Sequence, residues 1–176
     1  MGYALFANRK IMYSNMIFYL QMQLNQLSEE RMDNMIFTSN IADGELTDQE
    51  IFEDAGNIGM YTDYVLNEDA YVNAKYNEYK FTNSDGVAIS AGQYYYGRTS
   101  VTEEEELAAQ AYYKDILRKE YADELLEKFE IEDHRLEQKI SQIETKITVL
   151  QKNLEKVEEQ EGKAIDAATP NYGGVA

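Results

Sequence analysis

The chain has 176 residues and a net charge of −17, and it contains no cysteine, no tryptophan and a single proline. The absence of cysteine excludes disulfides, thiol chemistry and zinc–thiolate sites. The strongly acidic balance argues against nucleic acids and anionic membrane surfaces as partners.

The charge is distributed unevenly along the chain. Residues 1–38 are neutral overall, residues 39–101 and 102–134 each carry −8, and residues 135–157 carry +2. Such a pattern fits near-neutral terminal helices that are buried beneath an acidic middle segment. It fits an ordinary solvated acidic face equally well.

The N-terminal segment, residues 1–38, is expected to be one long helix from residue 3 to about residue 37. Ile17, Leu20, Leu24 and Leu27 follow one another at spacings of three and four, which places them on one helix face. Further apolar side chains, several of them Met, widen this face beyond what a two-stranded coiled coil needs. We interpret it as a core helix of a bundle or as a helix that several subunits contact.

Neither a membrane span nor a cleaved signal peptide is expected in this segment. Its most apolar run, residues 16–20, is far shorter than the roughly 20 residues that cross a bilayer. Arg9 and Lys10 could begin a signal peptide, but polar residues interrupt the apolar region and no small-residue cleavage site follows.

Residues 39–101 are expected to form a small acidic insert that is rich in tyrosine. Thr47 and Glu50 have the spacing of a capping box, which predicts a short helix from Asp48 to about Ala55. The string 39–50 also resembles an EF-hand loop, with Gly44 at the sixth position and Glu50 at the twelfth. Because Ile41 stands where the third position needs an oxygen ligand, a turn followed by a capping box is the favoured interpretation.

Eight of the 15 tyrosines lie between residues 61 and 96. A helix is expected over residues 62–74, and a β-hairpin over residues 79–89 around the turn residues 83–86. Tyrosine offers large amphipathic side chains for contact. The insert could therefore be a binding surface, a subunit contact or a small satellite core.

Residues 102–162 are expected to form a second long helix, followed by a tail over residues 163–176. Thr102 and Glu105 form another capping box, and Glu103–Glu106 place negative charge at the positive end of the helix dipole. The second half of this helix carries a coiled-coil seam with spacings of four and three. Its members are Leu136, Ile140, Ile143, Ile147, Leu150, Leu154 and Val157.

The seam could pair in two ways. Lys139 and Glu144 flank it in the manner that parallel pairing between chains requires. An antiparallel hairpin with the N-terminal helix needs a similar stripe. Both arrangements are compatible if the hairpin then packs against copies of itself.

No catalytic, cofactor-binding or metal-binding residues are expected. His134, the only histidine, lies among charged residues on a helix, so a nucleophile–histidine site has no supporting motif. Glycine-rich phosphate-binding patterns are absent. We therefore expect a protein that is not an enzyme and needs no cofactor.

The chain combines a neutral N-terminal helix, an acidic insert and a long C-terminal coiled coil, and it has no cysteine or tryptophan. This arrangement resembles the axial filament proteins of flagellar and type III secretion systems. In that class the terminal helices pair into a coiled coil that lines the filament, and the middle of the chain faces outward. Residues 134–145 are also similar to the C-terminal coil of uncharacterised small bacterial proteins that begin with Met-Gly and a long helix. That second resemblance implies a bacterial source and no known activity.

The expected fold is mainly α, with long terminal helices in an antiparallel hairpin or coiled coil and a small tyrosine-rich α+β insert. The expected function is a structural subunit that assembles with itself, as a helical polymer, into an extracellular or cell-surface filament, with export machinery as a further partner. The assembly interface would consist of Ile17, Leu20, Leu24, Leu27, Leu136, Ile140, Ile143, Ile147, Leu150, Leu154 and Val157.

Two alternatives remain at this point. One is a discrete coiled-coil oligomer, such as a virion structural protein or a cytoplasmic scaffold. The other is a tyrosine-rich module that binds a polysaccharide or a protein.

Overall fold

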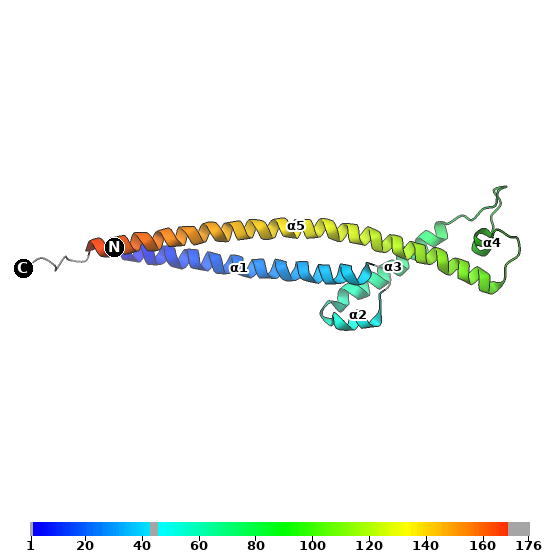
Figure 1. Ribbon diagram of the computed structural model, residues 1–176, viewed down its shortest axis with the longest axis horizontal. Coiled ribbons are helices and arrows are strands. Elements are labelled where there is room, and N and C mark those ends of the chain that lie inside the picture. Colours follow the sequence, from blue (N-terminus) through cyan, green and yellow to red (C-terminus); the bar gives the residue numbers. More distant parts are fainter. Residues whose placement is uncertain (1, 43–45, 169–176) are drawn as a thin grey trace, which may run out of the picture. The chain divides into compact units, whose positions relative to one another are not determined.

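The computed structural model describes residues 2–42 and 46–168, and these residues are mainly helical (Figure 1). Two long helices, α1 (Gly2–Ile41) and α5 (Glu103–Ala168), confirm the prediction of a mainly α protein with long terminal helices. Between them lie α2 (Asp48–Glu53), the 3₁₀ turn η1 (Ala55–Asn57), α3 (Ile58–Glu78) and α4 (Ala91–Tyr96).

The chain divides into two compact units. The first unit consists of Met1–Met32 and Asp133–Ala176, and the second unit consists of Asp33–Glu132. The helix boundaries expected from the sequence divide the chain into 1–38, 39–101, 102–162 and 163–176. In the structure, the first compact unit combines the two ends of the chain, and the second is one continuous segment. The tail residues 169–176 lie outside the described part of the chain.

In the first unit, α1 and α5 lie side by side (Figure 1). Ion pairs join Lys10 to Glu161 and Arg31 to Asp133. Leu136, Ile147 and Val157 of α5 are buried, but no residue of α1 between Ala4 and Met32 is. The first unit therefore has a thin core that α5 contributes almost alone.

The second unit has an aromatic core. Its centre is Phe37, Ile41, Tyr61 and Tyr64, which are all at least 97% buried. The Phe37 ring lies 5.1 Å from the Tyr61 ring and 5.3 Å from that of Phe129 on α5. The end of α1, the start of α3 and the first half of α5 thus meet around one ring.

The hydroxyl of Tyr61 is the polar element of this core. It donates a hydrogen bond to Asp54 Oδ2 at 2.7 Å and accepts one from Asn40 Nδ2 at 2.8 Å. Burial, reinforced by the bond to the Asp54 carboxylate, raises the pKa of Tyr61 to about 12. A buried tyrosine therefore keeps its hydroxyl satisfied without disturbing the apolar packing.

The capping boxes explain where three of the helices begin. The Thr47–Glu50 box precedes α2, and the Thr102–Glu105 box precedes α5, both as predicted. The end of α5 lies beyond the expected Gly162, at Ala168. A third box, Ser90–Gln93, begins α4, a helix that was not predicted although its Ser-x-x-Gln spacing is visible in the sequence.

The predicted β-hairpin over residues 79–89 does not form strands. Within the described residues, β-structure is limited to a single antiparallel bridge between Thr82 and Ala88. The turn itself is present, since the Asn83 side chain accepts hydrogen bonds from the backbone of Asp85 and Val87. The returning arm is too short for a strand because Ser90 already caps α4.

Candidate assembly surface

The predicted interface residues of α5 lie on its less exposed face. Leu136, Ile147 and Val157 are buried, and the remaining seam positions are half-buried: Ile140, Ile143, Leu150 and Leu154. On α1, the predicted stripe is half-buried throughout: Ile17, Leu20, Leu24 and Leu27. Because the described part of the first unit contains only these two helices, each stripe owes its lost exposure mainly to the other helix.

A polar groove runs beside the two stripes. Leu27 of α1 and Ile143 of α5 line the same hollow of about 410 Å³, so these two predicted interface residues come together. The other lining side chains are polar or charged, among them Gln23, Glu30 and Lys146. Such a lining places polar and charged groups along the edge of the apolar contact.

A bidentate ion pair stands near one end of this contact. Arg31 donates to both carboxylate oxygens of Asp133, at 2.6 and 2.9 Å, and lies 3.8 Å from Glu137. The hydrogen bonds from Arg31 hold the pKa of Asp133 below its usual range. The fork geometry fixes the register of α1 against α5 more strictly than apolar stripes can.

The outward face of α1 is the feature that sequence reasoning did not single out. From Ile11 to Ser28, 18 consecutive residues include no charged side chain. Within this run, six large apolar or aromatic side chains are 45–64% exposed. They are Ile11, Met12, Met16, Phe18, Tyr19 and Met22.

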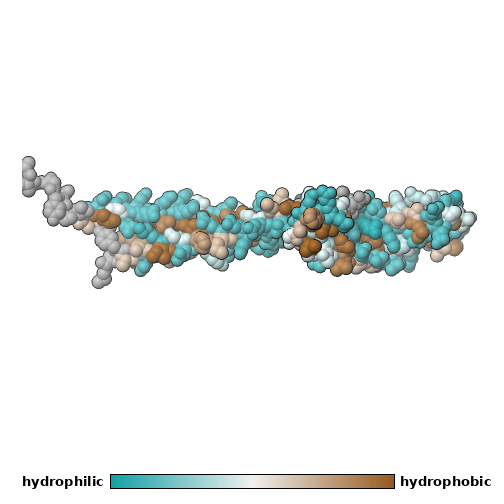
Figure 2. Space-filling model, turned by 90° about the horizontal axis from the view of Figure 1, so that it is seen from below, coloured by the Kyte–Doolittle hydropathy of each residue, from teal (hydrophilic) through white to brown (hydrophobic). Residues whose placement is uncertain are grey.

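The spacing of these exposed residues defines a surface, which we call the α1 patch. Ile11 and Phe18 are seven residues apart, as are Met12 and Tyr19, and Met22 follows Phe18 by four. Residues at these spacings lie on one side of a helix. The view of Figure 2, turned toward the side on which α1 lies, shows brown apolar patches among the teal surface of this region.

The outward face of α5 in the first unit differs from the α1 patch. Most of its exposed positions are charged or polar, such as Glu137, Glu144 and Lys146. Val149 and Ile165 are its only large hydrophobic residues with high exposure in the described part. The uncharged run from Ile11 to Ser28 is the sequence signal that distinguishes the outward face of α1 from that of α5.

The described residues hold no group of three or more His, Asp or Glu side chains that could bind a metal ion. His134 is exposed and has its Nδ1 3.7 Å from Glu137. Within the part of the chain that the structure describes, no helix combines the length and the low polarity of a membrane span. The Gly44 position of the EF-hand-like string lies outside the described residues.

Comparisons with known proteins did not identify a similar protein. No protein-family model matches the chain, and searches of curated proteins and of solved structures gave no match.

Proposed function

We propose that the protein is a non-enzymatic structural subunit that assembles with copies of itself through the α1 patch. The observation that carries this proposal is the exposure of six large apolar side chains on a helix face with no charge over 18 residues. Contiguous exposed apolar surface of this kind marks an interaction site on a monomer. Full burial of each such side chain would stabilise the assembly by about 1.5–3 kcal/mol at most.

A second copy is the occupant that the charges favour. With a net charge of −17, two copies repel one another over most of their surfaces. The uncharged α1 patch is where they can meet with little repulsion. A lipid surface fits less well, because helices that lie on membranes carry Lys and Arg on their polar face, and the run 11–28 has none.

The pairing of α1 with α5 as an antiparallel coiled-coil hairpin belongs to the same proposal. The ion pairs support it, because Lys10 meets Glu161 and the later Arg31 meets the earlier Asp133. In such a hairpin the two predicted stripes face one another within one chain. The α1 patch then remains on the outside for contact between chains.

We further propose that the assembly is a filament or tube outside the cell, as the architectural resemblance to axial filament proteins implies. Polymerisation needs two different surfaces on each subunit, because a single self-complementary face closes into a dimer. The groove beside Leu27 and Ile143 is the candidate for the second surface. Export machinery would be a partner in that case.

The alternative is a closed coiled-coil oligomer that acts as a scaffold inside a cell or a virion. The observation that favours it is the single continuous α1 patch, which suits a symmetric dimer. Both proposals use the α1 patch as the contact between copies. They differ in the size of the assembly, because a closed oligomer has a fixed mass and a filament does not.

The test combines sedimentation with negative-stain electron microscopy. The double variant Phe18→Glu/Met22→Glu places charge in the α1 patch at exposed positions, so it should leave helicity unchanged and weaken association at least about tenfold. Val149→Glu/Ile165→Glu is the matched control, because it adds the same two charges at exposed positions of α5. Wild-type protein that stays monomeric at high concentration would refute self-assembly, and particles of one fixed mass would refute the filament.

Salt provides a second criterion for the nature of the contact. An apolar contact between acidic copies should strengthen when ionic strength rises from about 0.05 to 0.5 M, because repulsion is screened. A contact held by ion pairs between chains would weaken over the same range.

A further inference from the structure

The short helix α4 is fixed rigidly to the start of α5. The Glu106 carboxylate accepts hydrogen bonds from the Ser90 hydroxyl at 2.5 Å and from the Gly92 backbone at 2.8 Å, which holds its pKa below the usual range. A Cβ at Gly92 would lie 3.1 Å from the Glu106 Cα, so the close approach requires glycine. Gly97 ends the helix in the left-handed conformation, at φ 64°.

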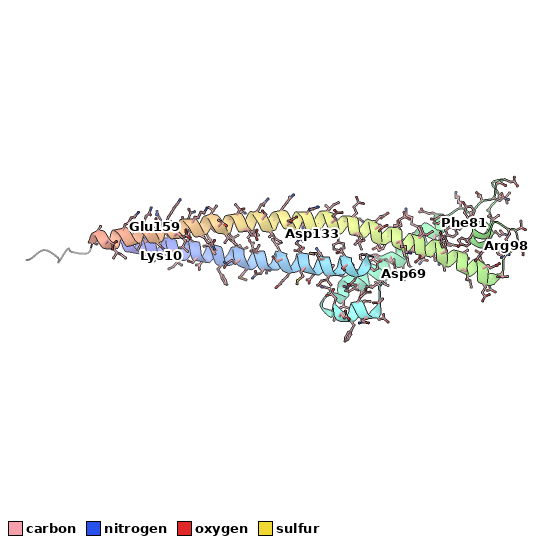
Figure 3. All side chains as sticks on the ribbon, in the orientation of Figure 1. Lys10, Asp69, Phe81, Arg98, Asp133 and Glu159 are labelled. Atoms are coloured by element: carbon pink, nitrogen blue, oxygen red, sulfur yellow. The ribbon has the colours of Figure 1, made fainter. Side chains whose placement is uncertain are left out.

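This frame presents a cluster of tyrosine rings that remain half open to solvent. Tyr94 packs against Phe81 at 5.5 Å and near Tyr113 at 6.4 Å, yet 52% of its surface is exposed. Figure 3 labels Phe81 and Arg98 in this part of the second unit. The exposed rings of the cluster are Tyr79, Tyr94, Tyr95, Tyr96 and Tyr112.

The rings of the cluster pack on one another and still leave part of their surface open to solvent. Phe81 is stacked on Tyr79 at 5.5 Å with an angle of 7° between the rings, and it is the half-buried centre of the cluster. Tyr95 and Tyr112, 4.9 Å apart, both keep nearly half of their surface exposed. Rigid tyrosines with one covered side are suited to contact because little rotamer entropy is left to lose.

A pocket of about 280 Å³ opens beside Tyr94. The segments 82–83 and 97–99 form two of its sides, and Ile89 and Gln93 complete it. This volume approaches the lower end of the range for small-molecule sites, which are concave, partly aromatic and supplied with a few polar groups.

The polar groups of this pocket are mostly hydroxyls and amides. The hydroxyls of Thr82, Thr99 and Tyr94 have no hydrogen-bond partner among the described residues. The Gln93 amide is already used, since it donates to the Thr99 carbonyl at 2.6 Å. Neutral groups therefore set the hydrogen-bonding capacity of the pocket.

The one charge at the pocket is already neutralised. Arg98 pairs with Glu105 and lies over the Tyr96 ring, 5.4 Å from its centroid. The Glu105 carboxylate balances its charge, which weakens its attraction for an anion. The net charge of −17 further disfavours an anionic ligand.

From this combination we infer that the pocket binds a neutral sugar unit of a glycan. A pyranose has one C–H face, which suits the negative face of a tyrosine ring, and a rim of hydroxyls, which suits Thr82, Thr99 and Asn83. The additional exposed tyrosines extend the contact to neighbouring sugar units. This site is separate from the α1 patch and does not depend on assembly.

The experiment is calorimetric titration of the full chain with three soluble glycans: cellohexaose, maltohexaose and chitohexaose. We expect at least one to bind with a Kd of about 1 mM or tighter. Tyr94→Ala should weaken that binding at least about tenfold. Tyr19→Ala is the control, because it removes an exposed tyrosine that belongs to the α1 patch.

A second variant separates recognition from folding. Thr82→Val/Thr99→Val removes two hydroxyls at nearly constant volume, so it should leave the fold intact and weaken glycan binding. Two results would overturn the inference: none of the three glycans binds at about 10 mM, or both variants bind as the wild type does.

Discussion

The two units of this chain complete their cores to different degrees. Among the described residues, the second unit buries nine hydrophobic side chains and the first unit three, all three of them on α5. The first unit meanwhile exposes six large side chains in the α1 patch. This uncovered apolar surface beside a thin core is the basis for our proposal that assembly involves the first unit.

The largest effect is expected when the core of the second unit is broken. Phe37→Ala removes a ring that contacts Tyr61, Tyr64 and Phe129, so the free energy of unfolding should fall by about 3–5 kcal/mol. Urea denaturation followed by circular dichroism measures the loss. The control is Phe52→Ala, since Phe52 is 81% exposed and should change stability by less than about 0.5 kcal/mol.

A smaller loss is expected in the first unit. Leu136 is fully buried, but the thin core around it can collapse into the space that Leu136→Ala leaves. The free energy of unfolding should therefore fall by about 2–3 kcal/mol, at the lower end of the usual range. Val149→Ala, at an exposed position of α5, serves as the comparison. Equal losses at Leu136 and Phe37 would show that the two cores are equally well packed.

The buried hydroxyl of Tyr61 predicts that the free energy of unfolding depends on pH. The pKa of Tyr61 is about 12 in the folded protein and about 10 in an unfolded chain. Its contribution is complete below pH 10 and is lost as the pH rises toward 12. Tyr61→Phe should cost about 1–2 kcal/mol at pH 7, and the difference from wild type should shrink at pH 11. A difference that stays constant would contradict this explanation.

The smallest effect concerns the ion pair of the first unit. Because Arg31 holds the pKa of Asp133 below its usual range, the pair contributes above about pH 4 and its contribution is lost as the pH falls through the folded pKa. Asp133→Asn should lower the melting temperature slightly at pH 7, and the difference from wild type should shrink as the pH falls below about 4. Glu144→Gln, on the same helix, controls for the loss of one negative charge. An unchanged melting temperature at pH 7 would mean that the pair is not stabilising.

Much of the helical architecture could be predicted from local signals. The capping boxes at Thr47 and Thr102 mark where α2 and α5 begin, because their chemistry is complete within four residues. The seam from Leu136 to Val157 is periodic enough to define one helix face. The prediction failed at residues 79–89 for two reasons. The Ser90 cap of α4 shortens the returning arm, and Phe81 is held by ring contacts to Tyr94 and Tyr113 that sequence alternation does not reveal.

The candidate surface was predicted only in part. The stripe of Ile17, Leu20, Leu24 and Leu27 was recognised by its spacing, but spacing cannot tell which of two apolar faces meets the partner helix. Phe18 and the three methionines of the α1 patch were counted as part of one broad apolar face, whereas Ile11 and Tyr19 were not included. Only the structure shows that these side chains are exposed, because it places α5 against the opposite face of α1.

Methionine oxidation tests the central claim most directly. Met12, Met16 and Met22 are about half exposed in the isolated chain, and Met35, outside the uncharged run, is 59% exposed. Peroxide treatment followed by mass spectrometry reports the accessibility of each sulfur. If copies meet through the α1 patch, the first three should become protected as protein concentration rises, while Met35 stays reactive. Equal oxidation of all four at every concentration would contradict assembly through α1.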